Sequence, residues 1–215
     1  MSSEKTCQCC KAPFSENFAK WIWPAALTDE ANQYIEYRHE FNVSDTTDAR
    51  ICISVDSDYA LWLNGNFINF GQYHDFADDK TYDNLDLSSA IKNGKNVLCV
   101  IAYHQKEGSF QYIKGDPGLI YVIKSGDSTF VSGTDTKYRR SSSYHSGQIA
   151  RITGQLGFTF EYNANGYDEW KCPEYIPGSD WASISDKDTK DAEERKVVRP
   201  RPINKLSLLN RVGTK

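Results

Sequence analysis

Two-residue alternation of hydrophobic and polar side chains is the feature that most constrains this chain. In residues 34–43, written YIEYRHEFNV, the odd-numbered positions are apolar or ring-bearing, and from Glu36 onward the even-numbered ones are polar. This period is typical of a β-strand with one buried face. Similar runs recur every 8 to 12 residues, and no stretch sustains a 3.6-residue period. The pattern predicts an all-β protein, an antiparallel β-sandwich with jelly-roll or Greek-key connections.

The stretch 59–71, YALWLNGNFINFG, contains the strongest turn signal in the chain. Asn64-Gly65 predicts a two-residue hairpin, because both central residues of a type I′ turn need positive φ. Tyr59 and Leu61 point to one face of the strand, and Trp62 points to the other. We expect Trp62 either to pack under a covering segment or to present its indole to a ligand.

Length and charge exclude several classes of protein. The chain has 215 residues, which suits one large β-domain with a full core. A net charge of −4 disfavours a nucleic-acid-binding face. There is no apolar run of 18 residues, so we expect no membrane association. The first residues, MSSEKTCQCCKAPF, lack the apolar stretch of a secretory signal, which favours a cytoplasmic protein.

Composition along the chain predicts three parts. Residues 1–17 read as a flexible N-terminal tail, residues 18–199 as the β-sandwich module, and residues 200–215 as an extended linker. The six cysteines show no disulfide framework. No histidine, serine or carboxylate stands in a recognisable catalytic motif, so no catalytic residue is predicted.

One acidic loop is a candidate metal site. Asp75, Asp78 and Asp79 lie close together in the segment HDFADD, and Ca²⁺ takes six to eight oxygen ligands from carboxylates and loop carbonyls. The spacing is not that of an EF-hand. Calcium binding and a simple solvated acidic loop are therefore the two alternatives at this position.

The order of several motifs resembles the N-terminal β-sandwich of bacterial α-L-rhamnosidases, which form glycoside hydrolase family 78. The motifs are WIWPA (21–25), YRHEF (37–41), ISVDSDYALWLNGNFINFG (53–71), YDNLDLSSAIKNGKNVLCV (82–100) and VVRPRPINKL (197–206). The resemblance implies a galactose-binding-like sandwich. It also implies that glycoside hydrolysis occurs on a separate helical barrel, toward which residues 200–215 would lead. Jelly-roll domains of family 2 β-glycosidases share the hairpin and are the alternative.

Two hypotheses about function follow. In the first, the chain is a non-catalytic module that packs against the rest of a multidomain hydrolase, with Trp170 and Trp181 as exposed docking side chains. In the second, it is a carbohydrate-binding module, and the resemblance implies rhamnose-containing glycans as its ligands. The predicted carbohydrate-binding residues are Trp62, Asn64, Asn66 and Tyr73, because ring faces match the C–H patches of sugars and amides match their hydroxyls.

Overall fold

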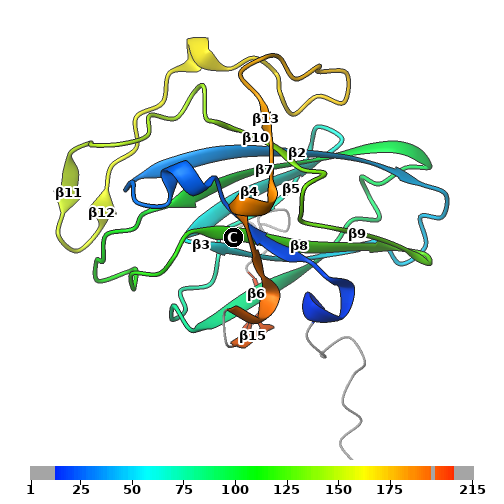
Figure 1. The fold of residues 1–215 in the computed structure, drawn as a ribbon, viewed down its shortest axis with the longest axis horizontal. Helices are drawn as coiled ribbons and strands as arrows, with labels where there is room; N and C mark the ends of the chain where they lie inside the picture. Colours follow the sequence, from blue (N-terminus) through cyan, green and yellow to red (C-terminus); the bar gives the residue numbers. More distant parts are fainter. Residues whose placement is uncertain (1–12, 195–196, 206–215) are drawn as a thin grey trace, which may run out of the picture.

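The computed structural model describes residues 13–194 and 197–205, and the protein is an all-β sandwich, as predicted. Figure 1 shows its two main sheets as stacked layers. A seven-stranded sheet has the spatial order β14-β1-β8-β3-β6-β15, with β9 also paired to β8. Its strands are β1 (Lys20–Ile22), β3 (Arg50–Asp56), β6 (Asp79–Asp86), β8 (Gly118–Ser125), β9 (Ser128–Val131), β14 (Thr189–Asp191) and β15 (Val197–Pro200).

The second sheet has six strands in the order β13-β10-β2-β7-β4-β5. A small two-stranded sheet, β11 with β12, lies at one end of the molecule (Figure 1). The strands are β2 (Gln33–Val43), β4 (Asp58–Leu63), β5 (Asn66–Phe70), β7 (Gly94–His104), β10 (Lys137–Arg140), β11 (Arg151–Thr153), β12 (Gly157–Phe158) and β13 (Ala182–Ser183). Single 3-10 turns occur at η2 (Ser15–Asn17), η3 (Ala25–Leu27), η4 (Ala164–Gly166), η5 (Asp186–Asp188) and η6 (Ala192–Glu194).

The main core lies between the two large sheets and follows the alternation in the sequence. Ile35, Leu61 and Val100 of the six-stranded sheet meet Ile53 and Tyr121 of the seven-stranded sheet, and all five are essentially inaccessible to solvent. Burial of such faces is the main favourable contribution to folding. No helix in the described part of the chain has the length and apolarity needed to cross a membrane.

The described residues near both predicted domain boundaries contact the sandwich. Residues 13–17, assigned to a flexible tail, include Phe14, which is buried with its ring edge-on to Tyr82 at 5.5 Å. Residues 200–205, assigned to a linker, continue from β15, and Arg201 pairs with Asp83 of β6. The predicted tail segment 1–12 and linker segment 206–215 lie outside the described residues.

Candidate functional site

The outer face of the six-stranded sheet carries three rows of side chains that face away from the core. Because strands β4, β7 and β2 are neighbours, residues at matching positions lie side by side across the sheet. The rows, from one end of the face to the other, are Asp58, Tyr103 and Tyr34; then Ala60, Ile101 and Glu36; then Trp62, Cys99 and Arg38.

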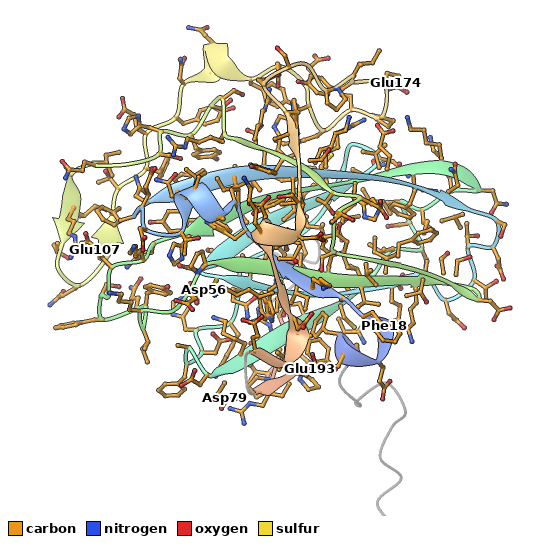
Figure 2. The ribbon with its side chains drawn as sticks, in the orientation of Figure 1. Phe18, Asp56, Asp79, Glu107, Glu174 and Glu193 are labelled. Carbon is orange, nitrogen blue, oxygen red and sulfur yellow. The ribbon has the colours of Figure 1, made fainter. Side chains whose placement is uncertain are left out.

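The segment between β10 and β13, residues 141–181, crosses over this face, and we call it the arm. Figure 1 shows it in yellow-green to orange above β2 and β10, on the side away from β3 and β8. In Figure 2, Glu174 marks the arm, and Asp79 lies at the opposite side of the molecule. One face of an antiparallel sheet is commonly solvated. A segment that covers such a face must therefore be held there by specific contacts.

Arg38 is the first anchor of the arm. Its guanidinium is buried and donates hydrogen bonds to the carbonyl oxygens of Trp170 (2.9 Å), Cys172 (3.1 Å), Pro173 (3.1 Å) and Tyr175 (3.0 Å). The planar fork of arginine can satisfy several acceptors at once, which the single ammonium of lysine cannot do in this geometry. Arg38 therefore fixes the backbone of residues 170–175 above the third row.

Arg139 of β10 is the second anchor. It contacts Glu36 (2.7 Å), Asp168 (2.7 Å) and Asp180 (2.7 Å), and its guanidinium lies 4.7 Å above the ring of Trp181. Burial raises the pKa of Glu36 above its ordinary value, since desolvation outweighs the opposing effects of the Ser141 hydroxyl and Arg139. Glu36 is thereby buried, whereas its row neighbours Ala60 and Ile101 stay partly accessible.

Between the arm and the sheet lies a groove made of two adjoining pockets, each of about 330 Å³. This volume falls at the lower end of the range of about 300–1,000 Å³ that is usual for small-ligand sites. The two pockets share a floor of Tyr59, Ala60 and Ile101 and a wall formed by Tyr144. We call the pocket that includes Asp58 the tyrosine end, and the pocket that includes Trp62 the tryptophan end.

Stacked aromatic rings form the tyrosine end. The ring of Tyr34 lies 4.6 Å from that of Tyr103 and is stacked on that of Tyr144 at 4.9 Å with an interplanar angle of 18°. Burial raises the pKa of Tyr34 to about 12, so its hydroxyl is neutral at physiological pH. Phe160 completes this wall. The tyrosine end therefore offers apolar ring faces together with neutral hydroxyl groups.

Asp58 is the carboxylate of the tyrosine end. Its Oδ1 accepts hydrogen bonds from the backbone N–H groups of Tyr59 (2.8 Å) and Gln72 (2.9 Å). Its Oδ2 takes part in no hydrogen bond or ion pair with any residue in the described ranges. An oriented carboxylate with one unused oxygen is a ready acceptor for a ligand hydroxyl.

Trp62 forms one side of the tryptophan end, and its indole is half-buried. From the sequence, this indole was expected either to pack under a covering segment or to face a ligand. The ring lies 5.7 Å from Phe67, 6.2 Å from Trp170 and 4.1 Å from the Nζ atom of Lys171. The arm therefore covers Trp62 in part, and the remaining surface of the indole lines the groove.

The two hairpin asparagines do not line the groove. Asn64 has φ of 53°, donates through Nδ2 to Ala90 O and Asn96 Oδ1, each at 2.8 Å, and accepts at Oδ1 from Val97 N at 2.9 Å. Asn66 is exposed, and its side-chain Nδ2 donates to the Asn64 carbonyl at 3.3 Å. Asn64 thus ties the turn to the start of β7.

Tyr73 does not line the groove but a smaller polar pocket of about 150 Å³, which adjoins the tyrosine end through Asp58 and Tyr103. The guanidinium of Arg201 lies 5.5 Å from its ring centre. Of the four predicted carbohydrate-binding residues, the structure places Trp62 in the groove and the other three outside it. The expectation that Trp170 and Trp181 are exposed docking residues is wrong, because both are buried on the side of the arm that packs against Val97 and Cys99 of β7.

The predicted calcium ligands are engaged in other contacts. The carboxylate of Asp75 accepts from Lys80 Nζ at 2.7 Å and from Thr81 N at 2.6 Å, whereas Asp79 pairs with Arg199 at 2.6 Å and Asp78 is exposed. Across residues 13–194 and 197–205, no group of three acidic, histidine or cysteine side chains is arranged to hold a metal ion. Calcium binding at this loop therefore stays a prediction.

Lys80 instead neutralises two buried carboxylates at this end of the sandwich. Its Nζ lies 3.0 Å from Asp56 and 2.7 Å from Asp75. His104 Nδ1 lies 3.2 Å from the other oxygen of Asp56. Buried charges persist only when they are paired in this way. We interpret this cluster as structural support for the strand ends beside the polar pocket that Tyr73 lines.

Comparisons with known proteins give the fold a context. Neither the protein-family models nor the curated proteins yield a match to the sequence. Among solved structures, the chain is similar to a β-sandwich domain of larger glycoside hydrolases. These enzymes are α-L-rhamnosidases of glycoside hydrolase family 78.

A family 78 rhamnosidase from Bacillus sp. GL1 superposes with a TM-score of 0.79 and 24% identity over 86% of this chain and 20% of that enzyme. The α-L-rhamnosidases of Dictyoglomus thermophilum (20% identity) and Aspergillus terreus (18%) each give a TM-score of 0.63, over 86% of this chain and 22% of theirs. The present chain thus spans about a fifth of these enzymes. At such identities the likeness establishes a shared fold.

Proposed function

We propose that this chain is a non-catalytic β-sandwich module of an α-L-rhamnosidase-like glycoside hydrolase, and that it binds carbohydrate in the groove beneath the arm. The observation that carries the proposal is the groove itself, in which aromatic side chains at both ends flank a floor of Tyr59, Ala60 and Ile101. Sugar rings present C–H patches to aromatic faces and hydroxyls at their edges. Tyr144 and Phe160 line the tyrosine end with aromatic surface, and Asp58 supplies an acceptor.

The carboxylates around the groove favour binding over hydrolysis. Glycoside hydrolysis needs two carboxyl groups with complementary roles on either side of the scissile bond. Asp58 and Glu36 are the acidic residues that line the groove, and Glu36 is already held by Arg139 and by the Ser141 hydroxyl at 2.7 Å. One carboxylate alone can orient a hydroxyl but cannot complete the acid and base pair.

The proposal extends to partners. The fold is shared with one domain of enzymes that are about five times longer, so the other domains of a multidomain hydrolase are the proposed neighbours of this module. Rhamnose-containing glycans are the proposed ligands, by analogy with the activity for which these structural neighbours are named.

Calorimetric titration with L-rhamnose and with rhamnose-containing oligosaccharides tests the proposal. We expect measurable heat, and we expect Tyr144→Ala to weaken binding about tenfold, which corresponds to the loss of about 1.4 kcal/mol from one ring contact. Tyr138→Ala is the matched control, because Tyr138 is also a half-buried tyrosine but packs against the main core and lines neither end of the groove. Absence of heat with every glycan, or equal affinity of the wild type and Tyr144→Ala, would contradict the proposal.

A further inference from the structure

Lys171 is the cation of the groove, and aromatic rings surround it. Its Nζ lies 4.1 Å from the ring centre of Trp62, 5.0 Å from that of Tyr167 and 5.6 Å from that of Trp170. It lines the tryptophan end. Within residues 13–194 and 197–205 it forms neither an ion pair nor a hydrogen bond, although an ammonium can donate three.

Two other cations on this sheet face, Arg38 and Arg139, are held by groups of the protein. Arg38 donates to four carbonyl oxygens of the arm, and Arg139 contacts three carboxylates. The nearby carboxylates are engaged as well, since Arg139 holds both Glu36 and Asp168. Lys171 is thus a cation that faces a ligand-sized space while the acids around it are paired with another residue.

The environment of Lys171 makes an added anion favourable. Burial lowers the pKa of Lys171, although attraction from Glu36 works in the opposite direction. A half-buried charge without a counter-ion is costly, and cation–π contacts offset only about 0.5–2 kcal/mol of that cost. A carboxylate placed at the ammonium would form a charge-assisted hydrogen bond in a partly desolvated site, where such bonds are stronger than in water.

The two ends of the groove carry charges of opposite sign, so a glycan with one charged sugar residue is held in one orientation. Asp58 at the tyrosine end repels anions and accepts hydroxyl protons, whereas Lys171 at the tryptophan end attracts anions. The ends meet at Ala60 and Ile101, so two consecutive sugar residues can occupy the groove together.

We infer that the groove selects an acidic saccharide, with the carboxylate of a uronic acid residue at Lys171 and a neutral sugar residue at Asp58. This inference rests on the proposed carbohydrate binding and specifies its ligand class. It assigns Lys171 as a specificity-determining residue, which the sequence alone did not single out.

The test compares two ligands that differ in one group. The first is a rhamnosyl-uronate disaccharide, and the second is the same disaccharide with its carboxyl group reduced to a primary alcohol. Calorimetry at about pH 7, well below the usual lysine pKa, is expected to show about tenfold tighter binding of the acidic form by the wild type. That preference is expected to shrink as salt is added, because salt screens partly exposed charges.

Two variants of Lys171 separate its charge from its bulk. Lys171→Gln removes the charge and is expected to bind both disaccharides equally, whereas Lys171→Arg keeps the charge and is expected to keep a preference for the acidic one. Lys92→Gln, at an exposed lysine outside the groove, is the matched control and should leave the preference unchanged. If Lys171→Gln fails to fold, Lys171→Arg and the salt dependence still provide the test.

The failure of this inference differs from the failure of the proposed function. If both disaccharides bind with equal affinity and Tyr144→Ala weakens both, the module binds carbohydrate but Lys171 does not select for charge, and the inference is overturned. If neither disaccharide binds and the neutral glycans give no heat, the proposed function falls and the inference falls with it.

Discussion

At the scale of single residues, the hairpin shows how a side chain can stabilise the turn that carries it. Asn64 and Asn66 both suggested amides that read sugar hydroxyls. In the structure, Asn64 uses its side chain to join the turn to Ala90, Asn96 and Val97, and its positive φ of 53° is the turn conformation itself. Asparagine suits this position because it tolerates the left-handed region better than other residues with a Cβ atom.

We expect Asn64→Ala to lower the free energy of unfolding by about 2–3 kcal/mol, from the loss of side-chain hydrogen bonds and the cost of a positive φ for alanine. Asn66→Ala, a chemically identical change two residues away at an exposed position, should cost less than about 0.5 kcal/mol. Urea denaturation measures both. Neither change should alter glycan affinity. Equal destabilisation by the two substitutions would refute the assigned role of Asn64.

At the scale of elements, the pairing of β15 with β6 is the feature that the sequence did not predict. The two strands are parallel, with Val198 opposite Lys80 and Pro200 opposite Tyr82. The prolines in this segment suggested an extended linker. The segment is indeed extended, but it forms an edge strand of the sheet. Edge strands tolerate proline because one side of their backbone needs no partner. Beyond β15, Arg201 and Lys205 both reach the carboxylate of Asp83.

Asp83 should make stability depend on pH. Burial works to raise its pKa, but hydrogen bonds from Arg201, Lys205 and Tyr59 outweigh burial and hold the pKa below its ordinary value. A carboxyl group with a depressed folded-state pKa stabilises the fold above its unfolded pKa of about 3.9, and this contribution is lost as the pH falls through the folded value.

We therefore expect Asp83→Asn to lower stability at neutral pH by about 3 kcal/mol, because it leaves Arg201 and Lys205 without their counter-ion. The acid-induced loss of stability below about pH 4 should also be less steep than in the wild type. Thermal unfolding across the pH range measures both effects. Asp78→Asn, at an exposed aspartate nearby, is the control and should match the wild type. Parallel pH profiles for the wild type and Asp83→Asn would contradict the assignment.

At the scale of the whole molecule, one core joins the two large sheets. Leu61 of β4 and Ile53 of β3 belong to the same buried cluster although they lie in different sheets. Side chains in such a close-packed interior cannot be shortened without leaving a void. The sheets should accordingly lose their structure together when the core is damaged.

Leu61→Ala tests this unity of the core. Its side chain is fully buried, and we expect a loss of about 2–5 kcal/mol in the free energy of unfolding. Tryptophan fluorescence and far-ultraviolet circular dichroism should report the same shifted transition. Ile176→Ala, at a position that is 86% exposed, should shift neither probe measurably. Separate transitions for the two probes would show that the sheets unfold independently.

Much of the fold could be predicted because its signals are local. Alternation in residues 34–43 and the Asn64-Gly65 turn are properties of a few adjacent residues, and both predictions are confirmed by β2 and by the β4–β5 hairpin. His39, which alternates with core residues, lies in the interior and bonds to the Tyr121 hydroxyl at 2.8 Å. The same alternation placed Trp62 on the face away from the core.

The groove could not be predicted, because its parts meet only when distant segments fold together. Tyr34 comes from β2, Asp58 from β4, and Tyr144 and Lys171 from the arm. Nothing near Lys171 in the sequence indicates that its ammonium will lie above Trp62. The available signal was the outward-facing side of an alternating strand, such as the side of residues 34–43 that carries Tyr34. This signal does not distinguish a solvated face from a binding face.

The sequence by itself determined the strands, the hairpin and the inward-facing side chains, because the period of the backbone fixes which side of a strand each residue occupies. Only the tertiary structure decided where the arm lies, and with it which outward-facing side chains become a groove. The reason is that Arg38 holds the arm through hydrogen bonds to residues such as Trp170, 132 positions away in the chain, and no local pattern encodes a contact of that range.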